Sequence, residues 1–311
     1  MATFATTVPG RTRDEELPHK LRVTMALAAA VVLVGGLGWY GWDYYMLDLA
    51  QRVEHPLHRV LRPSGTIGLR LGMFGVLLFM VIFIYPLRKR WRWLGAMGKT
   101  KHWLDFHSIV GVTAPIIITY HAAFKMGGLA GWAYWVMIGA ALSGFVGRYI
   151  YTMIPRSLHA TELTVGELDT ENARLSEDLS RQDKFEPGQL AALLEVPSPQ
   201  DVRRMPLLAV LWTLLLLDLK RPMLVSALRR RALGPGARLL TLGGILASGN
   251  RDLESVISNA RRQARLRTKI AFLDRVRQMF YLWHVVHRPF SVSFVILVVV
   301  HIGVVVTMGY F

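Results

Sequence analysis

The sequence contains no cysteine, and this absence removes several kinds of site at once. Disulfide bridges, iron–sulfur clusters held by cysteine, haem held by a thiolate and haem attached through a Cys-x-x-Cys-His motif are all excluded. Any haem in this protein must therefore be held by histidine or methionine side chains.

Acidic residues are also scarce. The chain has 21 aspartates and glutamates against 37 lysines and arginines, which gives a formal net charge of +16. In a soluble protein such an excess favours nucleic-acid binding, but the sequence has none of the usual DNA- or RNA-binding motifs. The basic residues instead cluster beside long apolar stretches. Cytoplasmic loops and anionic lipid headgroups explain them better, and we expect no nucleic-acid partner.

Apolar residues, in contrast, are abundant and come in blocks. Hydrophobic residues make up 52% of the chain and its mean hydropathy is +0.33, and five stretches are long enough to cross a bilayer as helices. These stretches lie at residues 21–47, 67–87, 106–124, 130–154 and 283–308. The fold class that they predict is an all-α integral membrane protein with a bundle of five transmembrane helices.

The same pattern predicts the domain organisation. We expect a cytoplasmic tail at 1–20, helices one to four within 21–155, a helical cytoplasmic insert at 156–282 and the fifth helix at 283–311. The leading region is long and contains acidic residues, so the first helix is interpreted as uncleaved rather than as a signal peptide. Within the insert, the apolar run 206–217 is too short to span a bilayer and has basic residues at both ends. We interpret it as interfacial or packed on a partner.

The distribution of lysine and arginine orients these helices. Basic residues are concentrated before the first helix, after the second and in the insert, while the opposite side carries few. The positive-inside rule then predicts a bacterial-type inner membrane protein with its N-terminus in the cytoplasm and Phe311 outside. The third and fifth helices run in the same direction in this topology.

Two of the apolar stretches carry a pair of histidines at the same interval. His107 and His121 are fourteen residues apart in the third helix, and so are His287 and His301 in the fifth. Fourteen helical residues turn through about 1400°, about 40° short of four turns, and rise about 21 Å, so each pair faces one side at two depths. Histidine inside a membrane segment is expensive and usually functional. Two bis-histidine iron sites are therefore predicted, and with them two b-type haems: one between His107 and His287, the other between His121 and His301.

A haem between helices also needs small residues where it crosses a backbone and cations for its propionates. Gly111 lies one turn after His107. The small residues that interrupt the last helix are Ser291, Ser293 and Gly303. The candidate cations are Arg88, Arg90, Arg92, Lys99, Lys101 and Arg288 on the cytoplasmic side, and Arg52, Arg59 and Arg62 on the outer side.

Four further histidines have other expected roles. His102 and His284 lie about 100° away from the faces that the histidine pairs define, so we expect them at the interface, in contact with propionates or a quinone headgroup. His55 and His58 resemble half of a zinc site, but no further ligands accompany them. A solvated loop is the expected role for these two, and a position beside the outer haem or a quinol is the alternative.

These features resemble a known family. The paired histidines, the basic loop before the third helix and the stretch Leu104-Asp-Phe-His107 resemble the ferric reductase-like transmembrane domain of ferric reductases and NADPH oxidases. The spacing also resembles cytochrome b of quinol–cytochrome c oxidoreductases. The resemblance covers about 66–155 and 281–311, and it implies that the four histidines ligate haem and that electrons cross the membrane. The sequence departs from the oxidases because no flavin and nicotinamide domain follows the fifth helix, and because its insert is unusually long.

We therefore expect an electron-transfer subunit of a larger oxidoreductase, and no catalytic residue is assigned. The expected partners are other subunits of a redox complex, including a soluble or peripheral electron-transfer protein on the insert or the outer face, and a quinone. One alternative is a complete enzyme that reduces ferric iron or oxygen at the outer haem. A proton- or metal-coupled transporter, which would be colourless, is another, and a purely structural membrane anchor is the last.

Overall fold

The computed structural model describes residues 13–88, 90–98, 100–154, 165–182, 185, 187–236 and 241–309. All the regular elements in these ranges are helices, and none is a strand, so the predicted all-α class holds for the described chain. The start of the predicted N-terminal tail, Lys99, the first residues of the predicted insert and Phe311 lie outside the described residues.

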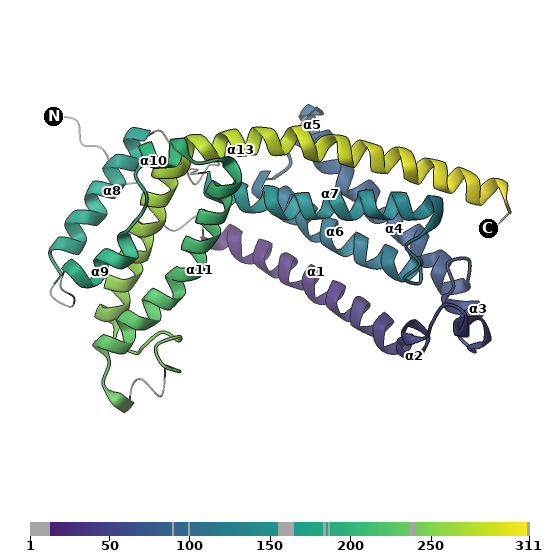
Figure 1. Ribbon diagram of the computed structural model, residues 1–311, viewed down its shortest axis with the longest axis horizontal. Coiled ribbons are helices and arrows are strands. Elements are labelled where there is room, and N and C mark those ends of the chain that lie inside the picture. The colour runs from purple at the N-terminus through teal and green to yellow at the C-terminus, as the bar shows by residue number, and fades with distance from the viewer. Residues whose placement is uncertain are drawn as a thin grey trace. The chain divides into compact units, whose positions relative to one another are not determined.

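The chain divides into two compact units (Figure 1). The first comprises Met1–Arg148 and His284–Phe311, and the second comprises Tyr149–Trp283. Five helices of the described chain are long and apolar enough to cross a membrane, which indicates a multi-pass membrane protein. The candidate spans lie in Leu17–Tyr40, His58–Arg88, Thr100–His121, Ala130–Met153 and Arg251–Thr307.

The first helix of the first unit, α1 (Arg13–Tyr40), stops short of its predicted end. Gly41 leaves the helical conformation (φ −103°, ψ 11°), and a short helix, α2 (Trp42–Met46), follows at once. A Cβ at position 41 would lie 2.4 Å from the ring of Tyr45, so only glycine fits here without a shift. The interruption allows the rings of Tyr44 and Tyr45 to be buried, and burial raises the pKa of Tyr45 to about 12.

Two short helices, η1 (Gln51–Glu54) and α3 (His58–Leu61), form the connection to the next span. Arg52 is buried in this connection and has a structural role. Its guanidinium donates to the carbonyl oxygens of Tyr45 (2.7 Å), Leu47 (2.9 Å) and Ala123 (2.5 Å). Arg52 therefore ties three segments together, which differs from its predicted role as a propionate cation.

The helices α4 (Thr66–Arg88) and α6 (Thr100–His121) pack together more extensively than any other described pair. Glycine makes this close approach possible. A Cβ at Gly75 would lie 2.3 Å from the side chain of Ile118 on α6. Helices in membranes often use small residues in this way, because small residues let the backbones come together.

The connection between these two helices contains α5 (Arg92–Gly95) and is held by Arg88. Arg88 is buried, and it donates to the carbonyl oxygens of Gly95 (2.9 Å) and Gly98 (2.8 Å) and to the hydroxyl of Thr100 (3.0 Å). Like Arg52, this residue was a candidate partner for a propionate, and the structure uses it to satisfy backbone carbonyls instead.

The fourth and fifth spans belong to α7 (Gly128–Met153) and α13 (Arg251–Thr307). The bounds of α7 agree closely with the prediction. In contrast, α13 begins at Arg251 rather than at Trp283 and continues for 57 residues, with Pro289 inside it. Hydropathy marks only the part of a helix that is apolar, so it could not reveal that the polar residues before Trp283 belong to the same helix. The helix contributes to both units.

The second unit is a helical assembly with its own apolar core. Its helices are α8 (Val165–Ser180), α9 (Pro187–Leu194), α10 (Pro199–Arg204), α11 (Leu207–Ala232) and the first part of α13. Leu190 of α9, Leu228 of α11 and Ile257 of α13 are among the residues of one buried cluster. Ser198 caps α10 because its hydroxyl accepts a hydrogen bond from the backbone N–H of Asp201 (3.1 Å).

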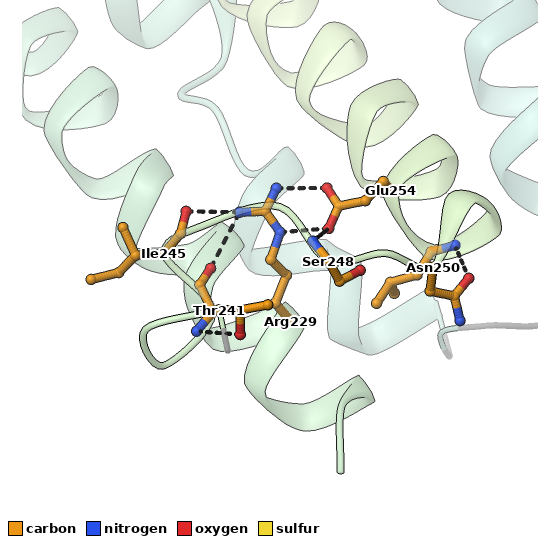
Figure 2. A network of polar contacts seen from close by, with 8 residues as sticks. Arg229, Thr241, Ile245, Ser248, Asn250 and Glu254 are labelled. Atoms are coloured by element: carbon orange, nitrogen blue, oxygen red, sulfur yellow. Dashed lines mark hydrogen bonds and ion pairs between the residues drawn. The ribbon is translucent and has the colours of Figure 1, made fainter. Parts of the chain in front are cut away.

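A polar network fixes the end of α11 against α13 (Figure 2). The guanidinium of Arg229 contacts both carboxylate oxygens of Glu254, at 2.9 and 2.6 Å, and it also donates to the carbonyl oxygens of Gly244 and Ile245. The carboxylate of Glu254 accepts a further bond from the backbone N–H of Ser248 (2.8 Å). Two-pronged arginine–carboxylate pairs of this kind fix geometry as well as charge.

The apolar run predicted at 206–217 turns out to be the start of α11, which extends to Ala232. Val210 and Leu214 are buried in a cluster with Ile150 and Phe272 of the same chain. The prediction that this run packs on a partner is therefore wrong for its buried side, because that side packs on the chain's own helices. The run is not among the candidate spans found in the described residues.

Candidate functional site

The outer pair of predicted ligands lies together in the first unit. The rings of His121 on α6 and His301 on α13 have centres 6.5 Å apart and are inclined at 74° to each other. Nδ1 of His121 lies 2.8 Å from the carbonyl oxygen of Gly68 on α4. The ring also lies over Gly72, where a Cβ would come within 2.7 Å of its Cε1. Two glycines of α4 therefore provide the acceptor and the space that this histidine needs.

The contact with Gly68 defines which nitrogen of His121 carries the proton. A carbonyl oxygen can only accept, so Nδ1 must donate, and in the neutral ring Nε2 then carries the lone pair. A metal-ligating histidine usually donates its other ring N–H to a carbonyl or carboxylate in this manner. His121 therefore has the tautomer of an Nε2 metal ligand.

His107, one of the inner pair, also has its Nδ1 against a backbone carbonyl of α4. Its Nδ1 lies 3.2 Å from the carbonyl oxygen of Ile82 on α4. In a regular helix this carbonyl would accept from the residue four positions later, but that residue is Pro86, which has no N–H. The proline therefore frees an acceptor for His107. As with His121, Nε2 is then the nitrogen that carries the lone pair.

His287, the other inner histidine, has its Nδ1 2.6 Å from the hydroxyl oxygen of Ser143 on α7. The same hydroxyl oxygen lies 2.8 Å from the carbonyl oxygen of Ala140. A hydroxyl can donate to Nδ1 or accept from it, so this contact holds the ring of His287 in place without fixing its tautomer.

The pairing fixes the direction of the helices that carry it. His301 lies beside His121, whose ring is at Gly72 of α4, and Phe294 lies beside Phe79 of α4, so the last part of α13 runs antiparallel to α4. The contacts of His121 with Gly68 and of His107 with Ile82 show that α6 is also antiparallel to α4, so α6 and the last part of α13 run in the same direction. Phe294 stands midway between the two histidines of α13 in the sequence and is buried. Its ring centre is 4.5 Å from that of Phe79 on α4. Aromatic packing thus fills the level between the two histidine pairs.

The geometry of the outer pair fits a haem iron. Metal–imidazole bonds are about 2 Å long, and a ring centre lies about 1 Å beyond its nitrogen, so two rings on opposite sides of one metal ion stand about 6 Å apart. The 6.5 Å between His121 and His301 agrees with this separation. No cluster of three or more His, Asp or Glu side chains that could hold a metal ion occurs among the described residues. A haem needs only two protein ligands, because the porphyrin supplies four nitrogens.

For the glycines and arginines that were also predicted to contact the haems, the structure shows open space or exposure but no contact that assigns a role. Gly111 and Gly303 have no atom within 4 Å of the place where a Cβ would be, so both leave open space beside a candidate ligand. Arg90, Arg92 and Arg288 are exposed. They stay predictions as propionate partners.

A polar cluster on the first unit was not predicted as a cluster. The imidazole of His19 on α1 stacks on that of His102 on α6, with ring centres 3.6 Å apart. Nε2 of His19 is 3.0 Å from the carboxylate of Asp105, which also pairs with Arg148 of α7. Asp105 belongs to the stretch before His107 that carries the family resemblance. Its contacts tie together three helices, α1, α6 and α7.

Sequence reasoning identified the histidines but missed the residues that hold them. Gly68 and Gly72 form a small-xxx-small pattern, which was a usable signal for close helix packing. The proline at 86 was a signal for a freed carbonyl, and Ser143 was a polar residue inside an apolar run. None of the three signals says which histidine benefits, because that depends on the packing of distant helices.

Comparisons with models of protein families, with curated proteins and with solved structures found no match to this chain.

Proposed function

We propose that the first unit binds two b-type haems, one between His107 and His287 and one between His121 and His301. The observation that carries this proposal is the outer pair, whose rings are 6.5 Å apart while Nδ1 of His121 is engaged by the carbonyl of Gly68. The repetition of that Nδ1 contact at His107 and His287 supports a second site of the same kind.

The residues of the chain have separable roles in this function. When bound, the haems supply reversible one-electron chemistry. Two imidazoles at each site would leave no ligand position for oxygen, which would favour electron transfer over oxygen binding. The carbonyls of Gly68 and Ile82 hold the rings of His121 and His107 with the proton on Nδ1, which leaves Nε2 free as a ligand and increases its basicity, and Ser143 holds the ring of His287 in place. The packed ring of Phe294 keeps the level between the sites apolar.

We further propose that the chain is an electron-carrying subunit of a larger oxidoreductase in a bacterial-type inner membrane. The excess of lysine and arginine around the second unit supports a cytoplasmic location for it, with the N-terminus on the same side. The resemblance of the histidine spacing to ferric reductase-like and cytochrome b domains supports transfer of electrons across the membrane. A soluble or peripheral protein on the second unit, or a quinone, is the proposed electron partner.

The test is a reduced-minus-oxidised visible spectrum with pyridine haemochrome quantification of the purified protein. We expect two haems per wild-type chain, and one haem in each of the variants His107→Ala and His301→Ala. His284→Ala is a matched control, because this histidine lies close to His287 on the same helix but about 100° away from the face of the pair. It should retain both haems.

Three outcomes would contradict the proposal. A wild-type protein that stays colourless although haem is supplied during expression would favour a transporter that uses the histidines. Loss of a haem by the control variant His284→Ala would reassign the inner ligand. Turnover of ferric iron or oxygen by the isolated chain with a supplied reductant would favour a complete enzyme over a subunit.

A further inference from the structure

The second unit contains a cavity of about 890 Å³ that the proposed electron transfer does not use. Its walls come from three helices and a connection: Glu171 of α8, Arg229 of α11, Ala247 before α13, and one face of α13 itself. The volume falls within the range of about 300–1,000 Å³ that is typical of sites for small molecules.

The lining of this cavity is strongly basic. Two carboxylates and five basic side chains line it, and each carboxylate already has a basic partner. Glu254 pairs with Arg229 at 2.6 Å, in the network of Figure 2, and Glu171 pairs with Arg262 at 2.6 Å. Three further cations line the cavity from α13, Arg261, Arg265 and Lys269. Within the described residues, neither carboxylate of the cavity neutralises Arg261 or Arg265.

These three cations are regularly spaced on α13. Residues four apart lie on one face of a helix, about 6 Å apart along its axis, so the row covers about 12 Å. Like charges at this spacing repel each other and destabilise a helix, and Arg261 and Arg265 form such a pair. A pair of this kind along the wall of a cavity, with Lys269 next on the same face, favours a ligand that brings several negative charges in a line.

The chemistry of the wall specifies the ligand further. Arginine binds phosphate through two parallel N–H donors, and phosphate groups in series would match successive cations of the row. Ile257, Leu266 and Ala247 also line the cavity, so part of its wall is apolar and suits an organic group. We propose that this cavity binds an organic molecule that carries two or more phosphate groups, held by Arg261, Arg265 and Lys269. Both a soluble nucleotide and a lipid headgroup with two phosphates have this chemistry.

The test uses the full-length protein in phosphatidylcholine nanodiscs, with binding measured by calorimetry. The probes are ADP, pyrophosphate and inorganic phosphate, and a second set of nanodiscs contains cardiolipin as the lipid with two phosphates. We expect saturable binding of ADP or pyrophosphate at least about tenfold tighter than that of inorganic phosphate, because two phosphates engage more cations. If cardiolipin is the source instead, its nanodiscs should abolish the binding of ADP.

Two triple variants, one at the three cations of the cavity and one at exposed arginines outside it, test whether these cations bind the ligand. The triple variant Arg261→Gln, Arg265→Gln and Lys269→Gln should weaken binding by at least about 30-fold, since each lost contact is charge-assisted. The control triple variant Arg231→Gln, Arg251→Gln and Arg277→Gln removes the same charge from exposed positions outside the cavity and should change affinity less than about threefold. Circular dichroism melting of all variants checks folding.

A third variant separates a cavity from a merely basic surface. Ser258→Trp retains every charge but fills part of the space, and it should weaken binding by at least about tenfold. Equal binding by Ser258→Trp and wild type would overturn the proposal, and so would equal losses in the two triple variants. Failure of ADP, pyrophosphate and cardiolipin to bind would also overturn it. None of these results depends on the haem histidines, so the two proposals stand or fall separately.

Discussion

At the scale of single residues, the glycine at position 72 shows how little space the outer histidine has. The ring of His121 lies where a Cβ at this position would be, with Cε1 at 2.7 Å and Nδ1 at 2.8 Å. Any larger residue must displace the ring, and a displaced ring loses its contact with the carbonyl of Gly68 as well as its relation to His301. The absence of a side chain at position 72 thus determines where the ring of His121 can lie.

This leads to a prediction for Gly72→Val. We expect the variant to lose one of the two haems while its helix content stays unchanged, and Gly72→Ala should show an intermediate loss. Gly35→Val is the matched control, because no atom lies within 4 Å of a Cβ at that position on α1, and it should retain both haems. Haem quantification measures the difference. Retention of two haems by Gly72→Val would show that the ring of His121 does not need this space.

At the scale of elements, α11 carries apolar side chains on both its buried and its exposed side, a difference in burial that sequence alone did not resolve. Val210 and Leu214 are buried, whereas Leu208 is 82% exposed and Trp212 and Leu219 are each 64% exposed. The buried side packs near Ile150, which belongs to the end of the fourth span. An exposed apolar stripe at the end of a membrane span, with basic residues beside it, is typical of a helix that lies in the membrane interface.

We therefore expect the exposed stripe of α11 to contact lipid. The absence of native cysteine allows a single label: a fluorophore attached to Trp212→Cys should be quenched by brominated lipids in nanodiscs. The same label on Ser255→Cys, an exposed position of α13, should not be quenched. Equal quenching at the two positions, or none at either, would contradict an interfacial position for this stripe.

The contrast between α7 and α11 shows how much of the fold the sequence could predict. Spans such as α7 are bounded by an abrupt change from apolar to polar residues, so their ends follow directly from hydropathy. α11 and the first half of α13 are mixed in composition, and their ends are set by packing within the second unit. For the same reason the sequence identified the four histidines but not their acceptors, since Ile82 serves through a backbone carbonyl that any residue possesses.

At the scale of the whole molecule, the distribution of charge divides the chain as clearly as its contacts do. Basic residues are frequent in the second unit, and several of them line its cavity. The segment between α2 and α4 has few, and one of them, Arg52, is buried among carbonyl oxygens. By the positive-inside rule this distribution predicts a cytoplasmic second unit, with the segment between α2 and α4 on the opposite side.

This orientation can be tested with two matched serines. We expect a membrane-impermeant thiol reagent to label Ser64→Cys, in the connection before α4, on intact spheroplasts. Ser255→Cys, in the second unit, should be labelled only after the membrane is permeabilised. Both serines are exposed, so a difference in labelling reports the side of the membrane. The reverse pattern would invert the topology and with it the assignment of the inner and outer histidine pairs.

The two carbonyls that hold His121 and His107 lie on one helix, α4, at Gly68 and Ile82, which are as far apart in sequence as the histidines themselves. α4 runs antiparallel to α6, and the spacing of its two acceptor carbonyls matches the spacing of the two histidines. Deleting a single residue between Gly68 and Ile82 would rotate one carbonyl by about 100° relative to the other and shorten their separation by about 1.5 Å. No rigid shift of α4 could then serve both histidines. The chain can tolerate changes of side chain along this stretch far more easily than a change in its length.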